Sequence, residues 1–148
     1  MRAEALAVRD RAGLLDLSPF SKWRVTGRGA QDFIDRLGAN RAPRRNGAAA
    51  ARWHDGDVLR TALPRDASAE DVTDARGCFV VAGSRSRELL GKLTDADLSN
   101  AAFPWLTAQH VRIAGIEVLA LRVNFVGELG WELHHPIDRS VELWRALL

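Results

Sequence analysis

The sequence has 148 residues, of which 47% are hydrophobic, and a formal net charge of only +2. This length suits one domain of ordinary size, and the apolar content excludes a chain that is disordered throughout. No apolar run approaches the roughly 20 residues of a membrane span, and the charged start MRAEALAVRD differs from a signal peptide, so we expect a cytoplasmic protein without a membrane partner.

The N-terminal part contains two helical and one clear strand-like pattern. Trp23 and Val25 alternate with polar residues, as in a half-buried strand. Phe33, Ile34 and Leu37 recur at helical spacing. In chain order we expect a helix at residues 2–12, a loop or short strand at 14–20, a strand at 21–27 and a helix at 29–40 that stops at Gly38 and Asn40.

Residues 41–76 are the least organised part of the sequence. HDGDVLRTAL, residues 54–63, predicts a turn at Asp55–Gly56 followed by a strand. LPRDASAEDVTDARG, residues 63–77, is polar and rich in turn formers, so we expect it to be mostly loop.

Regular patterns return in the C-terminal half. Strands alternate with helices there, and neighbouring strands are joined by tight turns, which is typical of an α+β fold. We therefore expect a single compact domain with a mixed or antiparallel sheet packed by helices. The expected elements are a strand at 78–83, a helix at 84–95 capped by Ser84, a loop at 97–105, two strands within 109–125 around a turn at Ala114–Gly115, a turn and strand at 126–136, and a helix at 138–148 capped by Asp138 or Ser140.

Charge and metal-ligand types give little direct evidence of function. Residues 1–65 hold 13 Lys+Arg against 7 Asp+Glu, which would attract a polyanion, but an Arg-rich composition explains the same imbalance and we expect no nucleic-acid partner. Cys78 lies in an apolar run and is expected to be a buried core thiol. His134 and His135 would face opposite sides of a strand, and HxH, HExxH and CxxC motifs are missing, so we expect no metal site.

The most informative local pattern is NFVGELGWE, residues 124–132. Its two glycines permit a tight turn, and on the outgoing strand Glu132 and His134 would face the same side. A carboxylate beside aromatic rings suits a flat heterocycle with an amino-amidine edge, such as a reduced pterin, because two oxygens accept two parallel N–H donors. A glycine hairpin with solvent-facing glutamates is the alternative interpretation.

Three longer segments carry a resemblance to a known family: AVRDRAGLLDLSPFSKWRVTGRGAQDFIDRLGAN, DVTDARGCFVVAGSRSRELLGKLTDADLSNAAFPW and ALRVNFVGELGWELHHPID. They cover most of the chain, and the last is the most specific. With them the sequence resembles the aminomethyltransferase (glycine-cleavage T-protein) family, and within it the C-terminal folate-binding region of dimethylglycine and sarcosine dehydrogenases. The resemblance implies that residues 1–148 form a T-protein-like folate-binding domain with tetrahydrofolate as its ligand.

The resemblance also implies roles for two residues. In relatives a glutamate at the position of Glu132 grips the pterin edge. An aromatic residue seven positions earlier, commonly tyrosine, lines the same pocket, and Phe125 holds that position here. Stacking is expected to survive this change, whereas a hydroxyl hydrogen bond worth about 0.5–1.5 kcal/mol is lost.

The chain departs from the family in its centre, which is expected to be shortened near residues 41–76. Relatives carry a catalytic aspartate on a strand there, and on that pattern Thr61 falls near its position. Threonine cannot act as a general base near neutral pH. Asp57 and Asp66 are candidate substitutes, so no catalytic residue is assigned. The further C-terminal domains of relatives are expected to be absent beyond Leu148.

Three functions therefore stand as hypotheses. The first is a tetrahydrofolate-binding domain of glycine-cleavage or sarcosine and dimethylglycine metabolism. The second is a working one-carbon transferase. The third is a non-catalytic interaction subunit that keeps the fold but not the ligand, and whose partner would be a subunit of an amine-oxidising complex.

Overall fold

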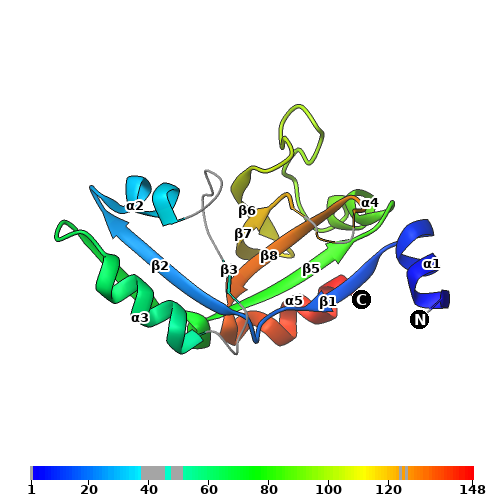
Figure 1. Ribbon diagram of the computed structural model, residues 1–148. Coiled ribbons are helices and arrows are strands. Elements are labelled where there is room, and N and C mark those ends of the chain that lie inside the picture. The colour runs from blue at the N-terminus through cyan, green and yellow to red at the C-terminus, as the bar shows by residue number, and fades with distance from the viewer. Residues whose placement is uncertain (1, 38–45, 48–51, 124, 126) are drawn as a thin grey trace. The chain divides into compact units, whose positions relative to one another are not determined.

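The computed structural model describes residues 2–37, 46–47, 52–123, 125 and 127–148 (Figure 1). The chain divides into two compact units, Met1–Leu17 with Ala75–Leu148, and the intervening Ser18–Asp74. Antiparallel sheets and helices occur in both units, which confirms the predicted α+β class. Among the described residues, no helix combines the length and the apolarity that crossing a membrane requires.

The first unit contains a five-stranded antiparallel sheet in which β5 and β8 run side by side (Figure 1). The sequence of β5, RGCFVVA, is rich in β-branched and aromatic residues, as a buried strand requires. The order across the sheet is β1 (Gly13–Asp16), β5 (Arg76–Ala82), β8 (Gly130–Pro136), β7 (Ile116–Leu121) and β6 (Ala108–Ile113). The expected strands of the C-terminal half are thereby confirmed to within a few residues.

The hairpin between β6 and β7 turns at Ala114 and Gly115, as predicted. Both residues have positive φ, 49° and 78°, which a type I′ hairpin turn demands. The N–H of Ala114 also donates to the carbonyl of Leu93 at 2.7 Å. This bond holds the alanine in a conformation that non-glycine residues seldom adopt.

One face of the five-stranded sheet forms the hydrophobic core of the first unit. Phe79, Trp131 and Leu133 alternate with residues on the other face, as the period of a strand dictates. The helical elements described in this unit are α1 (Arg2–Asp10), α4 (Ser86–Gly91), the 3₁₀ turn η3 (Ile137–Arg139) and α5 (Ser140–Leu147). Helices α4 and α5 supply Leu90, Leu143 and Leu147 to this core.

The predicted helix caps are wrong. Helix α4 starts at Ser86 rather than at residue 84, and Ser84 lies outside it with its hydroxyl 3.4 Å from the carbonyl of Arg11. Helix α5 has Arg139 at its cap position without a side-chain cap bond. The hydroxyl of Ser140 instead contacts His135 Nε2 at 2.9 Å. The hydroxyls of Ser84 and Ser140 thus form hydrogen bonds with residues outside the helices, and they do not cap the helix N-termini as local rules predict.

The second unit has a three-stranded sheet in the order β3 (Asn46–Gly47), β2 (Ser21–Gly27) and β4 (Ala67–Asp71), together with α2 (Ala30–Leu37), α3 (Arg52–Ala62) and the 3₁₀ turn η2 (Thr73–Ala75) that leads into the first unit. Strand β2 and helix α2 were predicted. Residues 38–40, with the expected stop signals, and residues 41–45 and 48–51 of the expected disorganised centre lie outside the described residues.

Two predictions for this unit are wrong. The expected turn and strand at 54–63 are part of α3, where Gly56 lies so close to the Trp23 ring that a Cβ would be 2.8 Å from it. The missing side chain of Gly56 leaves room for the Trp23 ring against helix α3. The turn predicted from Asp55–Gly56 is therefore replaced by helix. Residues 67–71 form β4 instead of loop, with alternating half-buried and exposed positions.

Arg52 joins helix α3 to the end of β4. Its guanidinium pairs with Asp71 at 2.6 Å and with Asp74 at 3.0 Å. Partial burial opposes ionisation of Asp71, but hydrogen bonds from Arg52 and Thr73 outweigh it and hold the pKa of this carboxyl below its usual value. The network thus supplies the second unit with a charge-dependent link between a helix and a strand.

Candidate functional site

The loop before β8 carries the predicted aromatic wall. Phe125 is 87% exposed, an unusual state for so large an apolar side chain. Gly127 has a φ of 76°, which confirms the expected glycine turn at this position. Asn124 and Val126, which belong to the same motif, lie outside the described residues. The loop therefore presents an aromatic ring to solvent.

Both ends of this loop are fixed to neighbouring elements. At its start, Arg122 is buried and donates from Nη1 to the carbonyl of Phe103 at 2.6 Å. At its end, the carbonyl of Leu129 accepts bonds from the N–H of Gly83 at 2.7 Å and the hydroxyl of Ser86 at 3.0 Å. These bonds position the strand that follows.

Arg122 has a role that the sequence interpretation missed. Its guanidinium carbon and that of Arg87 each lie 5.8 Å from the centre of the Trp131 ring, and both side chains donate to Asn100 Oδ1. Burial lowers the pKa of Arg122, and the positive charge of Arg87 lowers it further. Cation–π contact with Trp131 offsets part of the cost of burying this charge.

Strand β8 separates a polar face from the apolar core. Glu132 and His134 point to one side, as the strand period predicted, while Trp131, Leu133 and His135 point to the other. Glu132 is only 4% exposed and His134 only 7%. The expectation that these two residues share a face is thus confirmed, but the alternative of a solvent-facing glutamate at position 132 is wrong.

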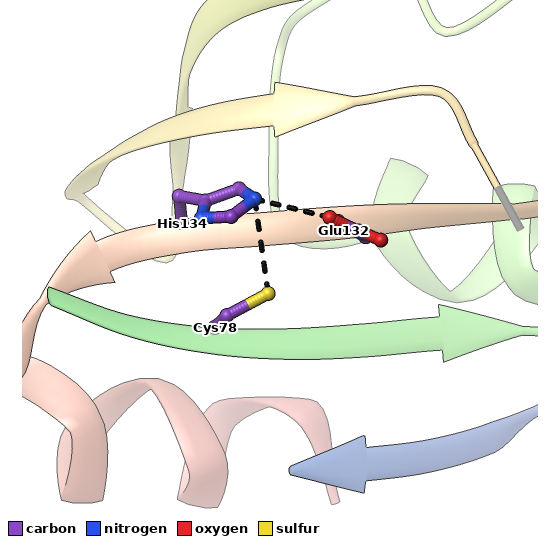
Figure 2. Close-up of side chains that lie close together, drawn as sticks. All are labelled: Cys78, Glu132 and His134. Carbon is purple, nitrogen blue, oxygen red and sulfur yellow. Dashed lines mark hydrogen bonds and ion pairs between the residues drawn. The ribbon is translucent and has the colours of Figure 1, made fainter. Parts of the chain in front are cut away.

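Strand β5 adds a third polar group to this face. Cys78 pairs directly with His134 in the β5–β8 ladder and is fully buried, as predicted for this thiol. Figure 2 shows the three side chains converging: His134 Nε2 lies 3.1 Å from Glu132 Oε2 and 3.8 Å from Cys78 Sγ. The three residues are called the β5–β8 cluster below.

The chemistry of the donors decides how the cluster is bonded. A carboxylate oxygen accepts, so the 3.1 Å contact is a hydrogen bond in the tautomer that carries a proton on His134 Nε2. This bond fixes the orientation of the carboxylate. One such bond does not exhaust a carboxylate, which offers about four lone-pair sites. The cluster therefore holds Glu132 in place on the buried face of β8.

The residues considered for the aspartate position lie in the second unit. Thr61 is on helix α3 and donates to the carbonyl of Asp57, so its assignment to a strand is wrong. The carboxylate of Asp57 pairs with Arg60 and is exposed. Asp66 is exposed in the turn before β4.

Two surface hollows of the described residues lie elsewhere. One is bordered by residues 91–96 and by the β6–β7 turn. The other lies between Arg11–Ala12 and residues 85–92. Neither Glu132 nor Phe125 lines them, so the predicted ligand residues do not belong to these hollows.

The sequence of this chain is similar to a known domain family and to several known proteins. The pattern described as the GCVT N-terminal domain matches residues 46–148. Dimethylglycine dehydrogenase of Mus musculus is 30% identical over 180 residues, covering 99% of this chain and 21% of that protein. The alignment is longer than the 148 residues of this chain, so the relative has internal residues that this chain lacks. The chain spans about a fifth of the length of such relatives.

Other similarities agree with this context. Sarcosine dehydrogenase of Mus musculus is 47% identical over 78 residues, covering 53% of this chain and 8% of that protein. The aminomethyltransferase T structure from Bartonella henselae has a TM-score of 0.74 at 19% identity, covering 99% of this chain and 48% of that chain. A chain of the heterotetrameric sarcosine oxidase from Corynebacterium sp. U-96 has a TM-score of 0.71 at 17% identity, with coverages of 98% and 88%. These two structures show that the fold is shared.

Proposed function

Because the chain belongs to the GCVT N-terminal domain family, we propose that it binds tetrahydrofolate as a domain of one-carbon metabolism. It is an aminomethyltransferase-like domain related to the glycine-cleavage T-protein and to the sarcosine and dimethylglycine dehydrogenases. Folate binding is the part that we propose in addition to this relationship, and the main observation that supports it is the position of Glu132.

Glu132 has the properties of a group that grips a pterin edge. It is a carboxylate held in a fixed orientation by His134 on a buried strand face. An amino-amidine edge presents two parallel N–H donors, which match the two oxygens of one carboxylate. Such charge-assisted bonds are strongest where water is excluded, and this supports Glu132 as the main binding group.

Phe125 supplies the second part of the proposed site. An exposed aromatic ring on an anchored loop is suited to stacking on a flat heterocycle. Relatives commonly have tyrosine at this position, so this chain would keep the stacking and lose one hydrogen bond. Binding weaker than that of the family is therefore expected.

Titration calorimetry with tetrahydrofolate under anaerobic conditions tests the proposal. Losing a hydrogen bond to a charged group costs about 1.5–3 kcal/mol, so Glu132→Gln should weaken binding about 10- to 150-fold. Glu117→Gln is the matched control, because Glu117 is an exposed glutamate on the neighbouring strand that pairs with Arg112. Equal affinities of the wild type and Glu132→Gln would refute the assigned site.

A folded wild-type protein that produces no binding heat at millimolar tetrahydrofolate would refute the function itself. The hypothesis of a non-catalytic interaction subunit would then remain.

We further propose that the domain functions beside a partner subunit in an amine-oxidising assembly, because a similar fold occurs in a heterotetrameric sarcosine oxidase. Light scattering after size exclusion, with and without a candidate oxidase subunit, tests this association, and two unchanged masses would refute it.

A further inference from the structure

We propose that the β5–β8 cluster, Cys78, Glu132 and His134, is a binding site for a divalent transition-metal ion of the zinc class. The site is assembled from two strands that are distant in the sequence and adjacent in the sheet. Metal binding by these residues does not depend on whether the domain binds folate.

The distances from His134 Nε2 to the other two groups are close to those of a metal coordination sphere. The three candidate ligand atoms all lie within 4.8 Å of one another. His134 Nε2 is 3.1 Å from the carboxylate oxygen and 3.8 Å from the sulfur (Figure 2). Around a tetrahedral zinc ion, with bonds of about 2.0–2.3 Å, neighbouring ligand atoms are about 3.3–3.6 Å apart. The two distances from His134 Nε2 lie within about 0.3 Å of these values. The separation of the sulfur and the carboxylate oxygen, which is at most 4.8 Å, would shorten as both atoms move onto the ion.

The donor types select the class of metal. One sulfur, one imidazole nitrogen and one carboxylate oxygen form a mixed set that suits zinc and disfavours calcium or magnesium, which prefer oxygen ligands alone. When the ion binds, the Cys78 thiol releases its proton to solvent and the His134 proton moves from Nε2 to Nδ1. The resulting thiolate and the carboxylate together carry two negative charges, which one divalent cation neutralises. Because all three side chains are buried, this neutralisation occurs where an isolated charge is costly.

Three protein ligands leave the fourth position of a tetrahedral ion open. Zinc sites that act on a substrate have this composition, whereas purely structural sites usually have four protein ligands. The fourth position would hold water or an anionic ligand.

Metal and pterin would compete for the same carboxylate, and this consequence does rest on the proposed function. The ion would bind the Glu132 oxygen that His134 now contacts, whereas a pterin edge would need both oxygens of the same carboxylate. Saturating zinc should therefore lower the apparent affinity for tetrahydrofolate, and tetrahydrofolate should lower the affinity for zinc by the same factor.

Cobalt(II) titration of the full chain tests the site directly. A cobalt–thiolate bond gives a charge-transfer absorption in the near ultraviolet, and Cys78 is the only cysteine in the sequence. We expect this band at one equivalent of cobalt in the wild type, with its displacement by zinc. Cys78→Ser should abolish the band, and His134→Gln should lower cobalt affinity by at least about 100-fold.

His110→Gln is the matched control, because His110 is an exposed histidine on β6. It should behave as the wild type does. A wild type without the charge-transfer band, or a band that survives in Cys78→Ser, would overturn the proposal. The absence of the band can be established on the wild type alone. The proposal can therefore be refuted even if a variant fails to fold.

A second measurement separates this proposal from the folate proposal. An ion that binds only the folded protein raises its thermal midpoint, so zinc should stabilise the wild type and His110→Gln but not His134→Gln. Cobalt binding without any heat from tetrahydrofolate would keep the metal site and refute the folate site. Glu132-dependent folate binding without the cobalt band would do the opposite.

Discussion

Replacing Gly77 by alanine should disturb the pairing of β5 with β8, which brings Cys78 beside His134. Gly77 pairs with His135 on the core face of the sheet. A Cβ at position 77 would lie only 2.2 Å from Nε2 of the His135 ring and 2.7 Å from Cε1. Because atoms do not approach so closely, the ring must move or the two strands must separate.

The contacts that the ring would lose set the size of the effect. Nδ1–H of His135 donates to the carbonyl of Leu133 at 2.9 Å, and Nε2 accepts from the hydroxyl of Ser140 at 2.9 Å. The ring also packs on Phe79 at 4.4 Å between centroids. Each hydrogen bond contributes about 0.5–1.5 kcal/mol and the ring contact a similar amount. After an entropic gain of about 0.4–1 kcal/mol from alanine, we expect a loss of about 2 kcal/mol.

Urea unfolding followed by circular dichroism measures this loss. Gly91→Ala is the matched control, because a Cβ at Gly91 in helix α4 has no neighbour within 4 Å, and its stability should stay equal or rise by up to about 1 kcal/mol. In a His135→Ala background the added methyl group of Gly77→Ala has room, so the loss of unfolding free energy caused by Gly77→Ala should be much smaller there than in the wild type. A Gly77→Ala protein as stable as the wild type would refute the described register.

Two further predictions concern the ligand loop and the second unit. Phe125→Tyr restores the hydroxyl of relatives and should tighten tetrahydrofolate binding about 2- to 12-fold by calorimetry, and unchanged affinity would show that the ring does not face the ligand. Asp71, whose pKa is lowered, stabilises the fold through Arg52 above its ordinary pKa of 3.8, and this contribution is lost as the pH falls through the lowered value. Asp71→Asn should therefore lower the urea midpoint at about pH 7, and the deficit should become smaller as the pH is lowered to about 3. A deficit that is equal at both pH values would contradict this pairing.

The sequence patterns predicted elements whose own residues determine their structure. The alternation in SKWRVTG, the apolar run of β5 and the tight turn at Gly115 specify local backbone preferences that the fold retains. Helix α3 was mispredicted because Asp55–Gly56 is a strong turn signal, and only contact with Trp23 makes the glycine favourable inside a helix. Strand β4 had a usable signal, since ASAED alternates with period two, but its small and acidic residues have low strand propensity.

The candidate site was predictable only along one strand. Glu132 and His134 are two residues apart, so the strand period alone predicts their shared face. Cys78 is separated from His134 by 56 positions, and its place beside the imidazole depends on the register between β5 and β8. Short metal-binding motifs could not reveal this arrangement. Arg122 was missed for a related reason, since its partners Phe103 and Asn100 come from a distant loop.

The pairing of β1 with β5 makes the second unit an insertion between two neighbouring strands of one sheet. The entropy lost when such a loop closes grows only with the logarithm of its length, at about 0.6 kcal/mol for each doubling. Lengthening or shortening the insert therefore changes the closure cost of the sheet very little. The loop-closure term therefore puts little constraint on the length of the insert, and the register that brings Cys78 beside His134 is set by the β5–β8 ladder itself.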